Sequence, residues 1–182
     1  MKRLNDYMAN TNTEKNEDCG KKILLELKKN CRLNLDVIAK RCGCSRYKVS
    51  RVMRKFEEDN TIIGYSAIVN PNKENLKHFI VLIKRSNLPV TEKILKKLPL
   101  NKLTDLIPGV NINLKDTEFV HGNFDWITSF TSEDTFNAKE YCNKILKMYN
   151  KFVEKVELLE VVLQVRKNGY KVPQSEQIKE II

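Results

Sequence analysis

The sequence lacks the features of membrane-spanning and secreted proteins. Its 182 residues contain no apolar run close to the roughly 18 residues that a membrane-spanning helix needs. Residues 1–20 are polar and contain no apolar stretch of the kind found in a secretory signal. We therefore expect a cytoplasmic protein with no membrane partner. With 41% hydrophobic residues, the chain can still bury the core of one medium domain or two small ones.

Cysteine and histidine are too few and too scattered to predict a disulfide framework, a metal site or a catalytic centre. The five cysteines are an odd number, and only Cys42 and Cys44 stand close together. We interpret these two as small, half-buried side chains, with a metal or redox role as the alternative. The two histidines, His78 and His121, have no nearby nucleophile and no metal-ligand spacing. We therefore expect no enzyme activity, no catalytic residue, no bound metal and no cofactor.

Positive charge, in contrast, is abundant and unevenly distributed. The 33 basic and 23 acidic residues give a net charge of +10, which favours a polyanionic partner such as nucleic acid. Residues 35–56 contain one acidic residue, Asp36. The same window contains seven basic residues: Lys40, Arg41, Arg46, Lys48, Arg51, Arg54 and Lys55. Much of the basic excess is therefore concentrated in one short segment.

This basic segment also has the apolar spacing of two short helices. Apolar residues recur at i, i+3, i+4 and i+7 twice, as Leu35, Ile38, Ala39 and Cys42 and then as Val49, Val52, Met53 and Phe56. Asn34 and Ser45 can cap the two helices, and Gly43 permits the turn between them. Because a further helix is expected over residues 20–30, the order of elements predicts a helix-turn-helix.

The third predicted helix presents a basic and polar face once its apolar stripe is turned inward. Such a helix fits the major groove of DNA, where base edges accept bidentate contacts from arginine and the walls are phosphate. We therefore predict double-stranded DNA as the partner. The predicted DNA-binding residues are Ser45, Arg46, Tyr47, Lys48, Ser50, Arg51, Arg54 and Lys55. The alternative is a solvated basic face that contacts nothing.

The second half of the sequence predicts a small α+β domain. Strands are expected over residues 62–70, 78–85, 118–121, 124–130 and 153–165, with Gly122-Asn123 as a hairpin signal. One helix should follow Pro89. A longer helix from Ser132 to about Asn150 has five residues on roughly one apolar face: Phe136, Cys142, Ile145, Leu146 and Tyr149. After the strand over 62–70, which leaves the first domain, the order is β-α-β-β-α-β, the ferredoxin-like plan.

Five local patterns, taken in order, resemble the Lrp/AsnC (leucine-responsive or feast-famine) family of transcription regulators. They are Ile23-Leu24 with Leu27, the segment from Ile38 to Ser45, Val49 to Val52 with Phe56, Ile62 to Asn70, and Gly122 to Trp126. The resemblance implies a winged-type helix-turn-helix over residues 17–61, a linker strand over 62–75 and a ferredoxin-like RAM domain over 76–171. Tails are expected over residues 1–16, which should be disordered, and 172–182.

The resemblance also implies an assembly and a ligand. RAM domains of this family pair sheet to sheet into homodimers, which assemble further into tetramers or octamers. An amino acid or another small effector binds between them. The residues of this chain that match the effector-binding positions are Gly122, Asn123 and Asp125 in the turn, and Val161 and Val162 on the last strand. Backbone N–H groups of such a turn can hold a carboxylate, and Asp125 could meet an ammonium group. The alternative is an ordinary turn stabilised by Asp125.

One segment departs from the family, and two other functions compete with DNA binding. The stretch near residues 99–115 makes its part of the chain about ten residues longer than in the family, so effector specificity is not transferred.

A related branch with the same two-domain build decarboxylates a tetrapyrrole, which would need a histidine- and tyrosine-bearing site. A pure assembly module with little DNA binding is the other alternative.

Overall fold

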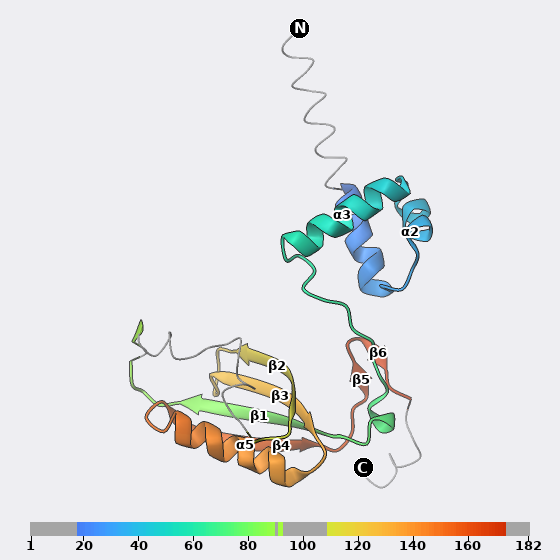
Figure 1. The fold of residues 1–182 in the computed structure, drawn as a ribbon. Coiled ribbons are helices and arrows are strands. Elements are labelled where there is room, and N and C mark those ends of the chain that lie inside the picture. Colours follow the sequence, from blue (N-terminus) through green and yellow to red (C-terminus); the bar gives the residue numbers. More distant parts are fainter. Residues whose placement is uncertain (1–17, 90, 93–108, 174–182) are drawn as a thin grey trace. The chain divides into compact units, whose positions relative to one another are not determined.

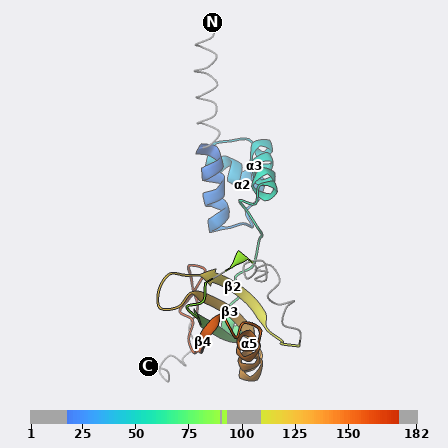
Figure 2. The same ribbon diagram turned by 90° about the vertical axis from the view of Figure 1, so that its left-hand side faces the viewer.

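The computed structural model describes residues 18–89, 91–92 and 109–173. The chain folds into two compact units that divide after Ala67, inside the predicted linker. Figures 1 and 2 show both units from two directions, and each is described by itself below. Element labels follow Figure 1.

The described part of the first unit, residues 18–67, contains three helices. Residues 18–29 are helical, and they are followed by α2 (Leu35–Cys42) and α3 (Arg46–Glu58). The predicted caps are confirmed: Asn34 Oδ1 accepts a hydrogen bond from the Val37 N–H at 2.9 Å, and Ser45 Oγ accepts one from the Lys48 N–H at 3.2 Å. Gly43 ends α2 with a φ of 65°, a left-handed conformation that glycine adopts without strain.

The apolar stripes of α2 and α3 meet the first helix in one core. Its buried members are Cys19, Ile23, Leu27, Ile38, Ala39 and Val49, and Val52, Met53 and Phe56 pack against them. Cys42 and Cys44 are half-buried free thiols, as expected, and burial raises the pKa of Cys44 to about 11. A raised pKa disfavours the thiolate form, which is the form that acts as a nucleophile.

The predicted strand over residues 62–70 is wrong within this chain. Residues 63–70 have no regular secondary structure, and Ile63 is 93% exposed. A strand exists only where a neighbouring strand completes its hydrogen bonds. No strand in the described part of the chain pairs with this segment.

The second unit is a four-stranded antiparallel sheet in the order β2-β3-β1-β4. After a 3-10 turn (Pro71–Lys73), the strands are β1 (Lys77–Arg85), β2 (Asn113–Phe119), β3 (Trp126–Ser132) and β4 (Val153–Val161). Helix α5 (Thr135–Met148) lies on one face of the sheet (Figures 1 and 2). This strand order confirms the predicted ferredoxin-like α+β class.

Several predicted boundaries of this unit need correction. Strand β2 begins at Asn113, within the stretch near 99–115 and five residues before the predicted strand start at residue 118. It is an edge strand with mostly exposed residues, so its sequence lacks the apolar alternation that identifies a half-buried strand. Strand β4 ends at Val161 rather than at residue 165. The helix expected after Pro89 falls almost entirely outside the described residues.

The core of the second unit lies between the sheet and α5. It comprises Phe79, Val81, Ile83, Trp126, Phe130, Ala138, Tyr141, Ile145 and Tyr149. The ring of Phe130 packs edge-on against that of Tyr141 with centroids 5.0 Å apart, and Phe79 stacks on Phe130 at 5.6 Å. Such aromatic pairs favour one arrangement of α5 on the sheet.

The predicted inner face of α5 is partly wrong. Phe136 is 73% exposed and Leu146 is 38% exposed, whereas Ile145 is fully buried. Nine residues separate Phe136 from Ile145, and at about 100° per residue these two side chains point in opposite directions. The buried stripe instead runs through Ala138, Tyr141 and Ile145.

A second small sheet follows β4 and was not predicted. Strands β5 (Arg166–Lys167) and β6 (Tyr170–Lys171) form a hairpin. Asn168 and Gly169 form its turn with φ angles of 47° and 83°, which are the positive values that a type I′ turn requires. The Asn-Gly pair is itself a strong hairpin signal in the sequence.

We predict that Ile145→Ala lowers the free energy of unfolding of the second unit by about 2–5 kcal/mol, because it leaves a cavity under the sheet. Phe136→Ala, a larger truncation on the exposed face of the same helix, should change it by less than about 0.5 kcal/mol. Urea unfolding followed by the fluorescence of Trp126, the single tryptophan of the chain, measures both. Equal losses in the two variants would contradict the placement of α5.

Candidate nucleic-acid interface

Helix α3 has two faces of opposite character. Tyr47, Ser50, Arg51 and Arg54 follow one another at i, i+3, i+4 and i+7, so they share one side of the helix. The inward stripe begins two residues later, at the fully buried Val49, and is rotated by about 200° from them. Packing against the core therefore forces the polar stripe outward. The side chain of Tyr47 is 77% exposed and does not lie over the first helix.

Some of the predicted DNA-binding residues already contact other groups of the protein, and others do not. Arg51, Arg54 and Lys55 are exposed, and no acidic side chain among the described residues forms an ion pair with them, although the charge of Lys55 contributes to lowering the pKa of Asp59. Arg46 is also exposed, but its Nη1 lies 3.3 Å from Asp36 Oδ2 of α2. The Ser45 hydroxyl accepts the capping hydrogen bond from the Lys48 N–H, so its role in this structure is to cap α3.

Part of the basic charge is structural, which the sequence did not reveal. Arg41 Nη1 of α2 lies 2.8 Å from Glu26 Oε2 on the first helix, and Lys29 Nζ lies 2.8 Å from Glu26 Oε1. Hydrogen bonds from Arg41 and then Lys29 hold the pKa of the Glu26 carboxyl below its ordinary value. Arg41 therefore ties α2 to the first helix. Two of the seven basic residues of the window, Arg41 and Arg46, form ion pairs with described acidic side chains.

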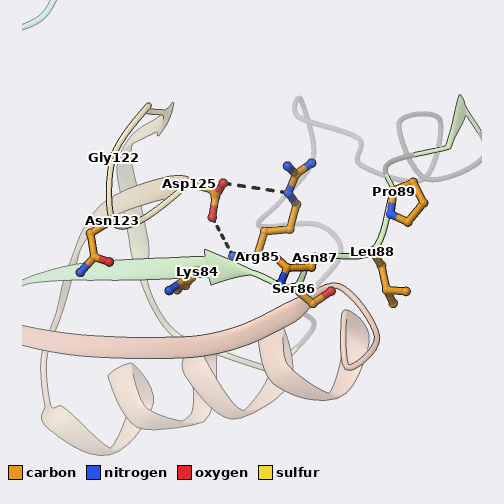
Figure 3. A pocket seen from close by; sticks show the side chains of 9 residues that line it. All are labelled: Lys84, Arg85, Ser86, Asn87, Leu88, Pro89, Gly122, Asn123 and Asp125. Carbon is orange, nitrogen blue, oxygen red and sulfur yellow. Dashed lines mark hydrogen bonds and ion pairs between the residues drawn. The ribbon is translucent and has the colours of Figure 1, made fainter.

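A second candidate site lies where the β2–β3 loop meets the end of β1 (Figure 3). Asp125 Oδ2 accepts a hydrogen bond from the Arg85 N–H at 2.9 Å, and its Oδ1 lies 4.0 Å from Arg85 Nε. The Asp125 N–H in turn donates to the Ile83 carbonyl at 3.0 Å. These contacts fasten the loop beside a pocket of about 360 Å³. It is lined by Lys84, Arg85, Ser86, Asn87, Leu88, Pro89, Gly122, Asn123 and Asp125.

The five predicted effector residues do not come together in one chain. Gly122, Asn123 and Asp125 line the pocket, but Val161 pairs with His78 at the opposite end of β1. Seven residues of extended strand separate His78 from Arg85, a distance of about 23 Å. Val162, which is 72% exposed, follows directly after β4. Because β4 runs antiparallel to β1, its last residues lie far from the loop. A single chain therefore does not bring the five residues together, and the site expected between RAM domains stays a prediction.

The remaining chemistry-bearing groups are dispersed. His78 is half-buried at the start of β1, and burial, followed by the charge of Lys167, lowers its pKa. His121 lies in the β2–β3 loop, near the other end of β1. Within the described residues, no group of three or more His, Cys, Asp and Glu side chains could hold a metal ion. None of the helices described is long and apolar enough to cross a membrane.

Comparison with known proteins agrees with this two-unit structure. Residues 20–63 match a family of winged helix-turn-helix DNA-binding domains. The leucine response regulatory protein LrpA of Mycobacterium tuberculosis is 18% identical, with a TM-score of 0.63, and the match covers 86% of this chain and 99% of that one. An AsnC family transcriptional regulator from Agrobacterium tumefaciens is 20% identical, with a TM-score of 0.60 and coverage of 88% and 97%.

A third solved structure contains a ligand. The feast or famine regulatory protein of M. tuberculosis in complex with L-methionine is 18% identical, with a TM-score of 0.61 and coverage of 86% of this chain and 98% of that one. No curated protein matches the chain in sequence. The chain thus has the fold of the Lrp/AsnC regulators, as the resemblance predicted, over most of its length.

We predict that Ser45→Ala destabilises the first unit by about 1 kcal/mol, because the Lys48 N–H at the start of α3 loses its partner. Ser45→Asn should retain most of the stability, since asparagine caps equally well. Urea unfolding followed by the helical circular dichroism signal tests both variants. If asparagine fails as alanine does, the hydroxyl has a role other than capping.

Proposed function

We propose that this chain is a transcription regulator of the Lrp/AsnC type that binds specific sites in double-stranded DNA through α3. The observation that supports this most directly is the polar stripe of α3, in which Tyr47, Arg51 and Arg54 are exposed and Ser50 is partly exposed. The packing of Val49 holds this stripe outward. The match of residues 20–63 to DNA-binding domains supports the same function. The function requires no catalysis, and a cytoplasmic location is part of the proposal.

In this proposal α3 enters the major groove, which is about 12 Å wide and admits one helix. Arg51 and Arg54 contact base edges or phosphates from the middle of the helix, while Tyr47 and Ser50 contact the groove near its N-terminus. Arg46, Lys48 and Lys55 lie beside this stripe and bind the phosphate walls. Lysine and arginine contacts to phosphate release counterions, so DNA affinity should fall steeply as salt rises.

We also propose that two copies of the chain pair through the sheet face opposite α5. Side chains that alternate with the core residues point to that face, and they include Ile80, Leu82, Ile127 and Leu159. No described element covers them, and Leu159 is 45% exposed. A two-fold homodimer would present two α3 helices to half-sites about one DNA turn or a multiple apart. Tetramers or octamers of such dimers are part of the same proposal.

An amino acid or a related small molecule is the proposed effector, bound in the pocket beside the β2–β3 loop. Lys84 and Arg85 supply positive charge, and Asn123 supplies a neutral polar group. Asp125 is already bonded to Arg85, yet its side chain is 42% exposed, so it can also meet an ammonium group. Val161 and Val162 can reach such a site only from another copy of the chain.

The DNA proposal is tested by truncating α3. Arg51→Ala or Arg54→Ala should weaken binding to fragments selected from the source genome by about 1–3 kcal/mol if the side chain contacts a base. Lys139→Ala, which removes an exposed charge from α5, serves as the control. A loss that is equal on all sequences would instead identify a phosphate contact. If the unchanged chain shifts no fragment at low salt, the proposal is wrong.

Asp36→Asn should tighten DNA binding. The substitution removes the one acidic group of the basic window and releases Arg46, while the exposed ion pair that it breaks contributes no more than about 1 kcal/mol to stability. Glu133→Gln, an exposed residue of the second unit, changes the net charge equally. Titration of labelled duplex measures both, and identical affinities for the two variants would contradict a role for Arg46.

Lys84→Gln should weaken binding of the effector, because the pocket loses one of its two cations. Calorimetric titration of a panel of amino acids first identifies a ligand for the unchanged chain. The matched control is Lys139→Gln on α5, outside the pocket. If no member of the panel binds, or if both variants bind equally well, the effector proposal is wrong while the DNA proposal stands.

A further inference from the structure

The hairpin of β5 and β6 is a second basic feature, which the DNA proposal for α3 does not include. Residues 162–173 contain three basic side chains, Arg166, Lys167 and Lys171, and no acidic one. The hairpin lies in the second unit, after the last strand of the main sheet (Figure 1). Lys167 lies on one face of the hairpin, and Arg166 and Lys171 lie on the other.

One face of the hairpin is anchored to the chain that leads into β1. Lys167 Nζ lies 3.2 Å from Glu74 Oε2 and donates to the Val69 carbonyl at 3.4 Å. The side chains of Lys167 and Glu74 are each only 23% exposed. Val172 is buried, and Asn72 Nδ2 donates to the Pro173 carbonyl at 3.2 Å. An isolated two-stranded hairpin is only marginally stable in water, so these contacts give this one a fixed position.

The other face presents two like charges directly opposite each other. Arg166 and Lys171 are paired residues of the antiparallel register, and both are exposed. Like charges in this cross-strand relation repel each other and destabilise a hairpin. Arg166 Nη1 also donates to the Gly169 carbonyl at 3.0 Å, which holds the guanidinium near the turn. No described acidic side chain forms an ion pair with either residue, whereas Lys167 has Glu74. An anion between the two cations would relieve the repulsion.

We propose that Arg166 and Lys171 form a second DNA contact, which binds backbone phosphates of the same duplex outside the segment held by α3. The inference rests on the proposed DNA-binding function. The duplex is the favoured polyanion because the hairpin anchors on Val69, nine residues after Asn60, whose N–H donates to the Glu57 carbonyl in the last turn of α3. Such a tether spans at most about 30 Å, which is close to one turn of DNA, so flanking phosphates are within its reach.

The test compares two double variants of the full chain with the same charge change. Arg166→Gln with Lys171→Gln removes the proposed contact, and Lys139→Gln with Lys147→Gln removes two exposed charges from α5. Affinity is measured against salt on a duplex that the unchanged chain selects. Each phosphate contact contributes about 0.9 to the slope of log K against log salt. We expect the hairpin variant to lose roughly one to two units of slope, and the α5 variant to lose almost none.

A shortened duplex sharpens the comparison. If the hairpin contacts flanking phosphates, trimming the DNA to the α3 footprint should weaken the unchanged chain and the α5 variant but leave the hairpin variant unaffected. Equal slopes for both double variants, or equal sensitivity to trimming, would overturn the inference. Because Arg166 also bonds Gly169, Lys171→Gln alone provides a variant with an intact turn, expected to lose about half of the effect.

Failure of this inference can be distinguished from failure of the proposed function. If the unchanged chain binds no duplex at any salt concentration, DNA binding itself is wrong, and the hairpin contact is wrong with it. If the unchanged chain binds and Arg51→Ala weakens it, while the hairpin variant matches the α5 variant, then only the hairpin contact is wrong.

Discussion

The packing of α3 against the other two helices of the first unit determines what this chain presents to its surroundings. Val49 is fully buried against a core formed with Ile23 and Ile38, and this fixes the rotation of α3 about its axis. Tyr47 and Arg51 are exposed because the inward stripe occupies the other side. If α3 were rotated by about 100° about its axis, polar side chains would be buried and apolar ones exposed, which is unfavourable. The apolar core therefore determines which face of α3 is exposed, in addition to stabilising the unit.

In the second unit, antiparallel pairing has the corresponding role. Strand β1 pairs with both β3 and β4, and this places the Asp125 loop at one end of β1 and Val161 at the other. The hydrogen bond from Arg85 N–H to Asp125 then fixes the loop beside the pocket. The pairing thus divides the predicted effector residues into two groups that one copy of the chain cannot unite.

Much of the structure could be predicted from sequence where local chemistry decides it. Asn34, Gly43 and Ser45 act within a few residues of their own position, so the turn and both caps follow from the sequence. The polar edge strand β2 and the exposure of Phe136 depend on which neighbours the fold supplies, and periodicity alone does not contain that information. The partners of Arg41 and Arg46 are likewise set by helix packing, so a count of charges overstates how many are free.

The extended segment between α3 and β1 has a further consequence. Ile63 and its neighbours up to Val69 are exposed, and the segment forms no hydrogen-bonded ladder with any described strand of its own chain. Its amide protons should therefore exchange with solvent almost as fast as those of an unstructured peptide. If another chain docks beside the segment as a strand, the same amides become protected. The rate of hydrogen exchange at these few positions therefore distinguishes a single chain from an assembly in which another chain pairs with the segment.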